Sequence, residues 1–198
     1  MPESLLIVRE RLRPRCEAAY SDIESEIADA SARLGCPHPY LALAPVDGTP
    51  EVWWLNTFSS ADEQARVNDA YARNQPLMAA LQTLGERKQR FLQEVTTVLT
   101  TRSAEPGRDP LHVCGARFFV VSRTPLADAA NEAFQSPEGE PFVFAAATTR
   151  EAAERIAGGV PDAVILAVQP QWSFADEAWM AADRDFWSAC PRARTTEI

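Results

Sequence analysis

The stretch that decides the fold runs from Glu51 to Leu84 and reads EVWWLNTFSSADEQARVNDAYARNQPLMAALQTL. Its first part, residues 51–58, is rich in aromatic and β-branched side chains and predicts a strand. Ser60 and Glu63 follow with the spacing of a capping box, in which a hydroxyl and a carboxylate each bind a backbone amide at the start of a helix. Pro76 interrupts that helix and begins a second helical run.

The residues on either side of this stretch complete a compact unit. Gly35 predicts the end of a long helix with an apolar stripe, and Asp47-Gly48 predicts a hairpin turn that leads into the strand described above. The predicted order is strand, helix, strand, strand, helix, strand, at residues 5–12, 14–34, 40–44, 51–58, 60–92 and 95–101.

The strand at residues 51–58 has two apolar faces. Trp53 and Leu55 lie on one face, and Trp54 and Asn56 lie on the other, because side chains alternate along a strand. We expect helices to cover one face and a ligand, a second sheet or a partner subunit to cover the other.

The second half of the chain alternates strands and helices less regularly. The loop Arg102 to Pro110 is the best candidate boundary, and it divides the chain into domains at residues 1–104 and 105–198. Beyond it, the sequence predicts strands at residues 117–121, 142–147 and 163–168, and helices at residues 126–134, 148–157 and 176–189. It gives no clear second hairpin, and we expect the tail over residues 191–198 to be disordered.

Composition excludes several classes of function. The formal net charge of −9 argues against sequence-independent binding to nucleic acid and against docking on an anionic membrane. The N-terminus does not read as an export signal, and no apolar run approaches the length of a membrane span, so we expect a cytoplasmic protein with its 4 cysteines reduced.

Residues 5–101 resemble the ferredoxin-like α+β barrel superfamily, which includes antibiotic-biosynthesis-monooxygenase-like and NIPSNAP-like domains. Three segments carry the resemblance: LIVRERLRPRCEAAY, EVWWLNTFSSADEQ and RNQPLMAAL. The resemblance implies an antiparallel sheet that faces a second sheet across a pocket, the second sheet coming from another subunit or from a tandem half. The predicted fold class is therefore α+β, a ferredoxin-like βαββαβ unit followed by a second α/β half that is a candidate degenerate repeat, in a homodimer or an internal pseudo-dimer.

Five residues are candidates for a ligand-binding pocket. Arg9 and Arg11 share a strand face and could hold an anion inside the barrel, although a solvated strand end paired with acids explains them as well. In the monooxygenases that the chain resembles, an Asn and a Trp hold an aromatic substrate, and Trp54 and Asn56 match them; the competing interpretation is a filled core. Tyr40 completes the predicted pocket.

Other polar residues give weaker signals. Cys36 with His38 and His112 with Cys114 could supply four zinc ligands, but their spacing is unlike that of zinc knuckles, so we predict no metal, no haem and no other cofactor. Glu10 stands on an apolar strand face and is expected to pair with a neighbouring arginine.

Three functions remain open from the sequence. The leading hypothesis is a small-molecule-binding α+β barrel protein. The alternatives are a cofactor-independent monooxygenase acting on an aromatic or quinol-like substrate in the same pocket, and a structural or partner-binding dimer without a ligand. A polar-lined cavity favours the first two, and a solidly packed interface favours the third.

Overall fold

The fold was obtained from a computed structural model that describes residues 3–103, 114–126 and 131–195. The described part of the first half contains four strands and three helices: β1 (Ser4–Leu12), α1 (Glu17–Leu34), β2 (Leu41–Pro45), β3 (Glu51–Phe58), α2 (Ala61–Arg73), α3 (Gln75–Gln89) and β4 (Leu92–Arg102). The second half contains β5 (Phe118–Ser122), β6 (Asn131–Gln135), β7 (Pro141–Ala147), α4 (Arg150–Ala157) and β8 (Val164–Val168), followed by the short helices α5 (Glu177–Ala182), α6 (Arg184–Trp187) and α7 (Pro191–Thr195).

The eight strands close into one antiparallel barrel in the order β1-β3-β2-β8-β5-β7-β6-β4. The first half contributes β4-β1-β3-β2 and the second half contributes β8-β5-β7-β6, so the strands of each half follow the same order relative to the chain. The second half is therefore a tandem repeat of the first. Residues 13–40 connect β1 to β2 through α1, whereas the much shorter segment 123–130 connects β5 to β6, and in this sense the repeat is degenerate.

Local sequence signals explain where the helices of the first half begin and end. Ser60 accepts a hydrogen bond from the backbone amide of Glu63 at 3.1 Å, and the carboxylate of Glu63 binds the amide of Ser59, which confirms the predicted cap of α2. Gly35 ends α1 with a left-handed φ of 71°. The helix itself begins at Glu17, later than predicted, because Pro14 and Arg15 form a turn.

The predicted helix over residues 126–134 is wrong where the structure describes it. Residues 131–135 form β6, which makes a hairpin with β7 and closes the barrel against β4. Phe134 is fully buried inside the barrel, and its inward-facing neighbour along the strand is Glu132, which pairs with Arg102 at 3.1 Å. This inward-facing carboxylate hides the alternation of a half-buried strand, so the sequence suggested neither the strand nor the hairpin.

Two predictions about the C-terminus are also corrected. The expected helix over residues 176–189 is divided at Asp183, whose carboxylate accepts a hydrogen bond from the amide of Phe186 and binds Arg117 at 2.7 Å. The tail that follows, expected to be unstructured, begins with helix α7. Among the described residues, no helix combines the length and the apolar character that a membrane crossing requires.

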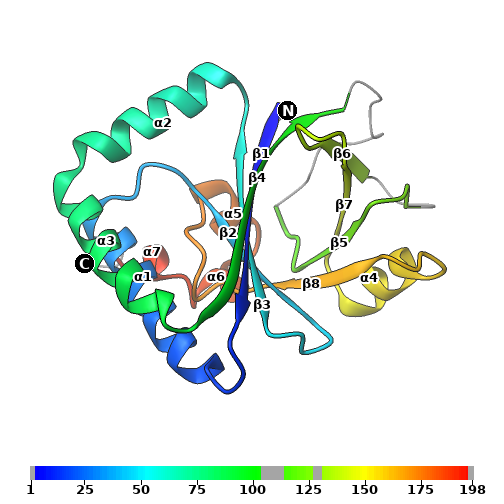
Figure 1. The fold of residues 1–198 in the computed structure, drawn as a ribbon, viewed down its shortest axis with the longest axis horizontal. Helices are drawn as coiled ribbons and strands as arrows, with labels where there is room; N and C mark the ends of the chain where they lie inside the picture. Colours follow the sequence, from blue (N-terminus) through cyan, green and yellow to red (C-terminus); the bar gives the residue numbers. More distant parts are fainter. Residues whose placement is uncertain (1–2, 104–113, 127–130, 196–198) are drawn as a thin grey trace.

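Both faces of β3 are covered, as predicted. The inner face meets the second half of the chain across the barrel, and the outer face meets helices; α1, α2 and α3 lie together on one side of the barrel in Figure 1. The tandem half thus supplies the second sheet. Buried apolar side chains from both halves fill the barrel interior, among them Leu5, Ile7, Trp53, Leu55, Phe119, Phe134, Phe144 and Leu166.

Candidate functional site

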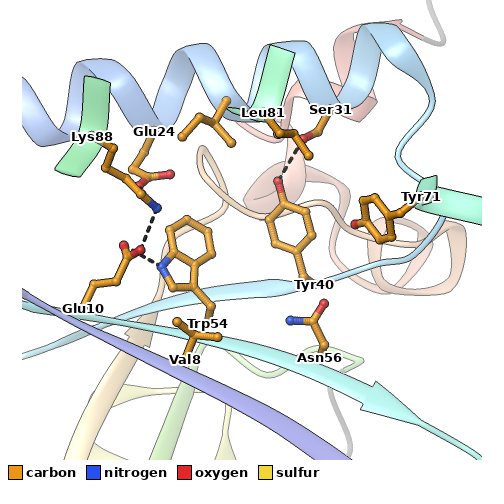
Figure 2. A pocket seen from close by; sticks show the side chains of 11 residues that line it. Val8, Glu10, Glu24, Ser31, Tyr40, Trp54, Asn56, Tyr71, Leu81 and Lys88 are labelled. Atoms are coloured by element: carbon orange, nitrogen blue, oxygen red, sulfur yellow. Dashed lines mark hydrogen bonds and ion pairs between the residues drawn. The ribbon is translucent and has the colours of Figure 1, made fainter. Parts of the chain in front are cut away.

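A cavity of about 260 Å³ lies outside the barrel, between the sheet and helices α1 to α3 (Figure 2). We call it the sheet–helix cavity. Its floor is the outer face of β1 and β3, and its walls come from the three helices and the segment before β2. The lining residues are Val8, Glu10, Glu24, Ile27, Ser31, Tyr40, Trp54, Asn56, Tyr71, Leu81 and Lys88.

Strand register and helix periodicity bring these residues together. Val8 pairs with Trp54 across β1 and β3, and side chains directly opposite in an antiparallel pair share a face. On α1, residues 24, 27 and 31 follow at helical spacing and lie on the same side. The junction of α2 and α3 is held against the end of α1 by Asn74, whose amide donates to the carbonyl of Leu34 at 2.8 Å.

One end of the cavity is a buried charged network. Nζ of Lys88 lies 2.7 Å from Oε1 of Glu10 and 3.0 Å from Oε1 of Glu24. Oε2 of Glu10 accepts hydrogen bonds from the Tyr20 hydroxyl and, at 3.1 Å, from Nε1 of Trp54. Glu10 is thus a buried acid whose ion-pair partner is a lysine on α3, not the neighbouring arginine that the sequence suggested.

Burial and neighbouring charges together set the protonation of this network. Burial raises the pKa of Glu24 to about 7, an effect that the Lys88 ammonium opposes and the Glu10 carboxylate reinforces. For Lys88, burial acts to lower the pKa, but the two carboxylates outweigh it and the pKa is raised. The lysine is therefore held as an ammonium ion, and Glu24 is the group of this pair that titrates near neutral pH.

The other end of the cavity is lined by hydroxyl, amide and aromatic groups. The Tyr40 hydroxyl donates to Oγ of Ser31 at 3.5 Å, and the Tyr40 ring lies edge-on to Trp54 with 5.9 Å between centroids. The Tyr71 hydroxyl lies 3.0 Å from Sγ of Cys36. Burial raises the pKa of both tyrosines, so both stay protonated at neutral pH. Asn56 points toward this end from the floor (Figure 2).

The structure separates the predicted pocket residues into two groups. Tyr40, Trp54 and Asn56 line the sheet–helix cavity, whereas Arg9 and Arg11 lie on the opposite face of the sheet. There the two arginines line a separate cavity of about 140 Å³ with Glu51, Glu94 and Thr96. Arg9 is bound by the carboxylate of Glu51 at 2.9 Å, which matches the alternative interpretation of arginines paired with acids.

Glu24, Tyr71 and Lys88 were not identified as cavity residues from the sequence. A signal existed for the two charged residues. Glu24 lies four residues after Tyr20 and three before Ile27, inside the apolar stripe of α1, and Lys88 continues the stripe of α3 one heptad after Leu81. An opposite charge in each of two facing apolar stripes indicates a buried pair.

Of the two cysteine and histidine pairs, Cys36 contacts the cavity residue Tyr71, as described above. Nε2 of His38 lies 2.9 Å from the carbonyl of Thr57, and its ring stacks on Phe58. His112 lies outside the described residues, and Cys114 is exposed. Within the ranges that the structure describes, no group of three or more His, Cys, Asp or Glu side chains could hold a metal ion.

Comparison with known proteins shows a shared fold without close sequence similarity. The chain matches no protein-family model and no curated protein sequence. A candidate monooxygenase of Fusobacterium nucleatum has a TM-score of 0.54 at 5% identity, with 85% of this chain and 92% of that chain covered. An anthrone oxidase-like protein has a TM-score of 0.53 at 11% identity, with the same coverage.

A NIPSNAP family protein of Agrobacterium tumefaciens covers 54% of this chain and 91% of its own length, at 17% identity and a TM-score of 0.38. The chain has the ferredoxin-like α+β barrel fold that the sequence predicted, with both halves of the barrel in one polypeptide.

Proposed function

We propose that the sheet–helix cavity binds a small organic molecule, with Tyr40, Trp54 and Asn56 in contact with it. The cavity combines apolar walls with a few polar groups at defined positions, which is typical of small-molecule sites. Aromatic rings on the floor and wall offer flat surfaces for a planar ligand.

One observation carries this proposal. The amide of Asn56 lines the cavity, and no hydrogen bond joins it to any other residue that the structure describes, whereas the neighbouring Tyr40, Tyr71 and Trp54 side chains are bonded to protein groups. A polar group left without a partner in a cavity gains most from a ligand that completes its hydrogen bonds.

Blocking the cavity tests the proposal. A library of aromatic fragments is screened against the full chain by ligand-observed NMR, and the fragments that bind are titrated by calorimetry. Leu81→Trp places an indole in the cavity and should abolish their binding. Met78→Trp adds the same indole at an exposed position of the same helix and should leave binding unchanged. A screen without binders, or binders indifferent to Leu81→Trp, would remove the proposal.

A second candidate is a cofactor-independent monooxygenase, which the pairing of Trp54 with Asn56 in one cavity favours. An electron-rich phenol or quinol would stack on the indole, and the Asn56 amide would donate a hydrogen bond to the oxyanion that develops when the substrate loses its proton. Oxygen uptake with hydroquinones and anthrones tests this activity. Equal rates for the native protein and for Asn56→Ala would count against it.

A further inference from the structure

The charged end of the sheet–helix cavity carries more acid than base. Glu10 comes from β1, Glu24 from α1 and Lys88 from α3, and their side chains are 6%, 1% and 15% exposed. When both carboxylates are ionised, they face one ammonium group, so the network holds one uncompensated negative charge. An uncompensated buried charge is costly.

Glu24 has an acceptor that the protein does not use. Its Oε1 contacts Lys88 at 3.0 Å, whereas its buried Oε2 accepts no hydrogen bond of standard geometry from the described residues, since the nearby Tyr20 hydroxyl donates to Glu10. Figure 2 shows this carboxylate extending from α1 above the ring of Trp54, at the edge of the cavity that it lines. A buried carboxylate oxygen without a donor is unusual in a native structure and points to a donor that binds there.

We infer that the cavity takes a small organic cation, a protonated amine on an aromatic or apolar body, and that Oε2 of Glu24 accepts a hydrogen bond from its ammonium group. This inference rests on the proposed binding function and names the class of ligand. The ammonium would supply both the missing donor and the missing positive charge, in a charge-assisted hydrogen bond.

The rest of the cavity suits such a ligand. The rings of Trp54 and Tyr40 lie beside the network and can receive the body of the ligand, and an aromatic face attracts a nearby cation. The formal net charge of −9 favours the approach of cations. An anionic ligand would have to compete for Lys88, which two carboxylates already bind.

Binding of an amine is expected to release a proton. The titratable groups around Glu24 are Glu10 from the sheet, Tyr20 from its own helix and Lys88 from the facing helix; Lys88 and the Tyr20 hydroxyl favour the ionised carboxylate, and Glu10 opposes it. Burial raises the pKa of Glu24 to about 7, so below that pH the carboxyl group is mostly protonated and must ionise to bind a cation. Amine affinity should therefore rise with pH through about 7 and level off above it.

Three probes with a common phenyl ring test the inference on the full chain: benzylamine, benzyl alcohol and benzoate. Calorimetry should show benzylamine binding about tenfold or more tightly than benzyl alcohol, and benzoate weakest. Titrations at about pH 6, in two buffers that differ in ionisation enthalpy, should show proton release that disappears at about pH 8.5.

Two variants distinguish an effect of the Glu10–Glu24–Lys88 network on amine binding from a general effect of the protein's negative charge. Glu24→Gln keeps the shape of the side chain and should remove both the preference for benzylamine and the proton release. Glu26→Gln removes an exposed carboxylate of the same helix and should change neither. Because proton release is measured on the native protein, the test does not depend on the folding of either variant.

Several results would overturn the inference. These are equal affinity for the amine and the alcohol, tighter binding of benzoate, benzylamine binding that survives Glu24→Gln, or no detectable benzylamine binding. If benzyl alcohol or benzoate binds at least as tightly as benzylamine and Leu81→Trp abolishes that binding, the amine assignment alone is overturned and the proposed binding function stays in place.

Discussion

Arg9 of β1 pairs with Trp53 of β3, and its guanidinium group lies 4.3 Å from the centre of the Trp53 ring, on the barrel side of the sheet. The adjacent indole, Trp54, points to the other side of the sheet and lines the sheet–helix cavity. The two neighbouring tryptophans thus lie on opposite faces of the sheet. Trp53 has an arginine over its ring, and Trp54 lies beside a buried lysine and two carboxylates.

This separation predicts how two variants affect ligand binding. Arg9→Met should leave the affinity of cavity-binding fragments within about twofold of the native value, because the guanidinium lies on the opposite face of the sheet. Asn56→Ala should weaken fragments that contact the amide by about 2- to 10-fold, the worth of one net hydrogen bond. Calorimetric titration measures both. A larger loss for Arg9→Met than for Asn56→Ala would mean that ligands enter the barrel side.

Lys88→Met should destabilise the protein strongly. The change leaves Glu10 and Glu24 buried without a cation, and breaking a buried ion pair from one side costs about 3–5 kcal/mol. Urea unfolding at neutral pH measures the loss, which should shrink toward pH 5 as the Glu24 carboxylate takes up a proton. Arg87→Met removes the exposed partner of Glu26 on the same helix, and its unfolding midpoint should stay close to the native value. Equal effects of the two variants would mean that the network is solvated.

Glu24 predicts a specific dependence of stability on pH. Its pKa is raised to about 7 in the folded protein from an ordinary value of 4.5, so the folded state holds this proton more tightly than the unfolded state. Between about pH 4.5 and 7 the unfolded chain loses the proton first, and the contribution of Glu24 to the free energy of unfolding must fall as pH rises. Below this window and above it, the contribution is constant.

The measurement is the difference in unfolding free energy between the native protein and Glu24→Gln, taken across this pH range. The native protein should lose stability relative to the variant as pH rises from about 4.5 to 7. Glu26→Gln should not reproduce this trend, because Arg87 lowers the pKa of Glu26. Parallel curves for the native protein and Glu24→Gln would contradict the raised pKa.

The closing strand of the barrel can be tested at Phe134. This side chain is fully buried and meets Phe144 edge-on, with 6.1 Å between ring centroids. Phe134→Ala should lower the unfolding free energy by about 3–5 kcal/mol. Gln135→Ala changes the exposed next residue of β6 and should cost less than about 0.5 kcal/mol. A mild effect of Phe134→Ala in urea unfolding would place this ring outside the barrel.

The difference between the two halves shows which fold features the sequence carries locally. In the first half, Ser60 and Glu63 cap a helix, Gly35 ends one, and Asp47-Gly48 turns a hairpin, so each element has its own signal. In β6, Phe134 and Glu132 face the barrel interior. Arg102 from another strand compensates the buried charge of Glu132. That compensation is a tertiary contact, which no local pattern contains.

The residues of the candidate site also divide into those placed by local sequence and those placed by tertiary contacts. Trp54 and Asn56 could be predicted to share a face, because the period of a strand is fixed by backbone geometry. Their separation from Arg9 depends on which face of β1 meets which face of β3, and that is set by the register of the pairing. The approach of Glu24 and Lys88 depends on how α1 packs on α3.

The sequence by itself determined the order of elements in the first half, the two covered faces of β3 and the ferredoxin-like fold, because each depends on periodicity, caps and turns within a short segment. Only the tertiary structure decided that the second half closes the barrel, that the described cavity with Tyr40, Trp54 and Asn56 lies between sheet and helices, and that a lysine is shared by two buried acids. These features depend on contacts between residues far apart in the chain. Such contacts contribute to the free energy of folding only after the elements have packed together.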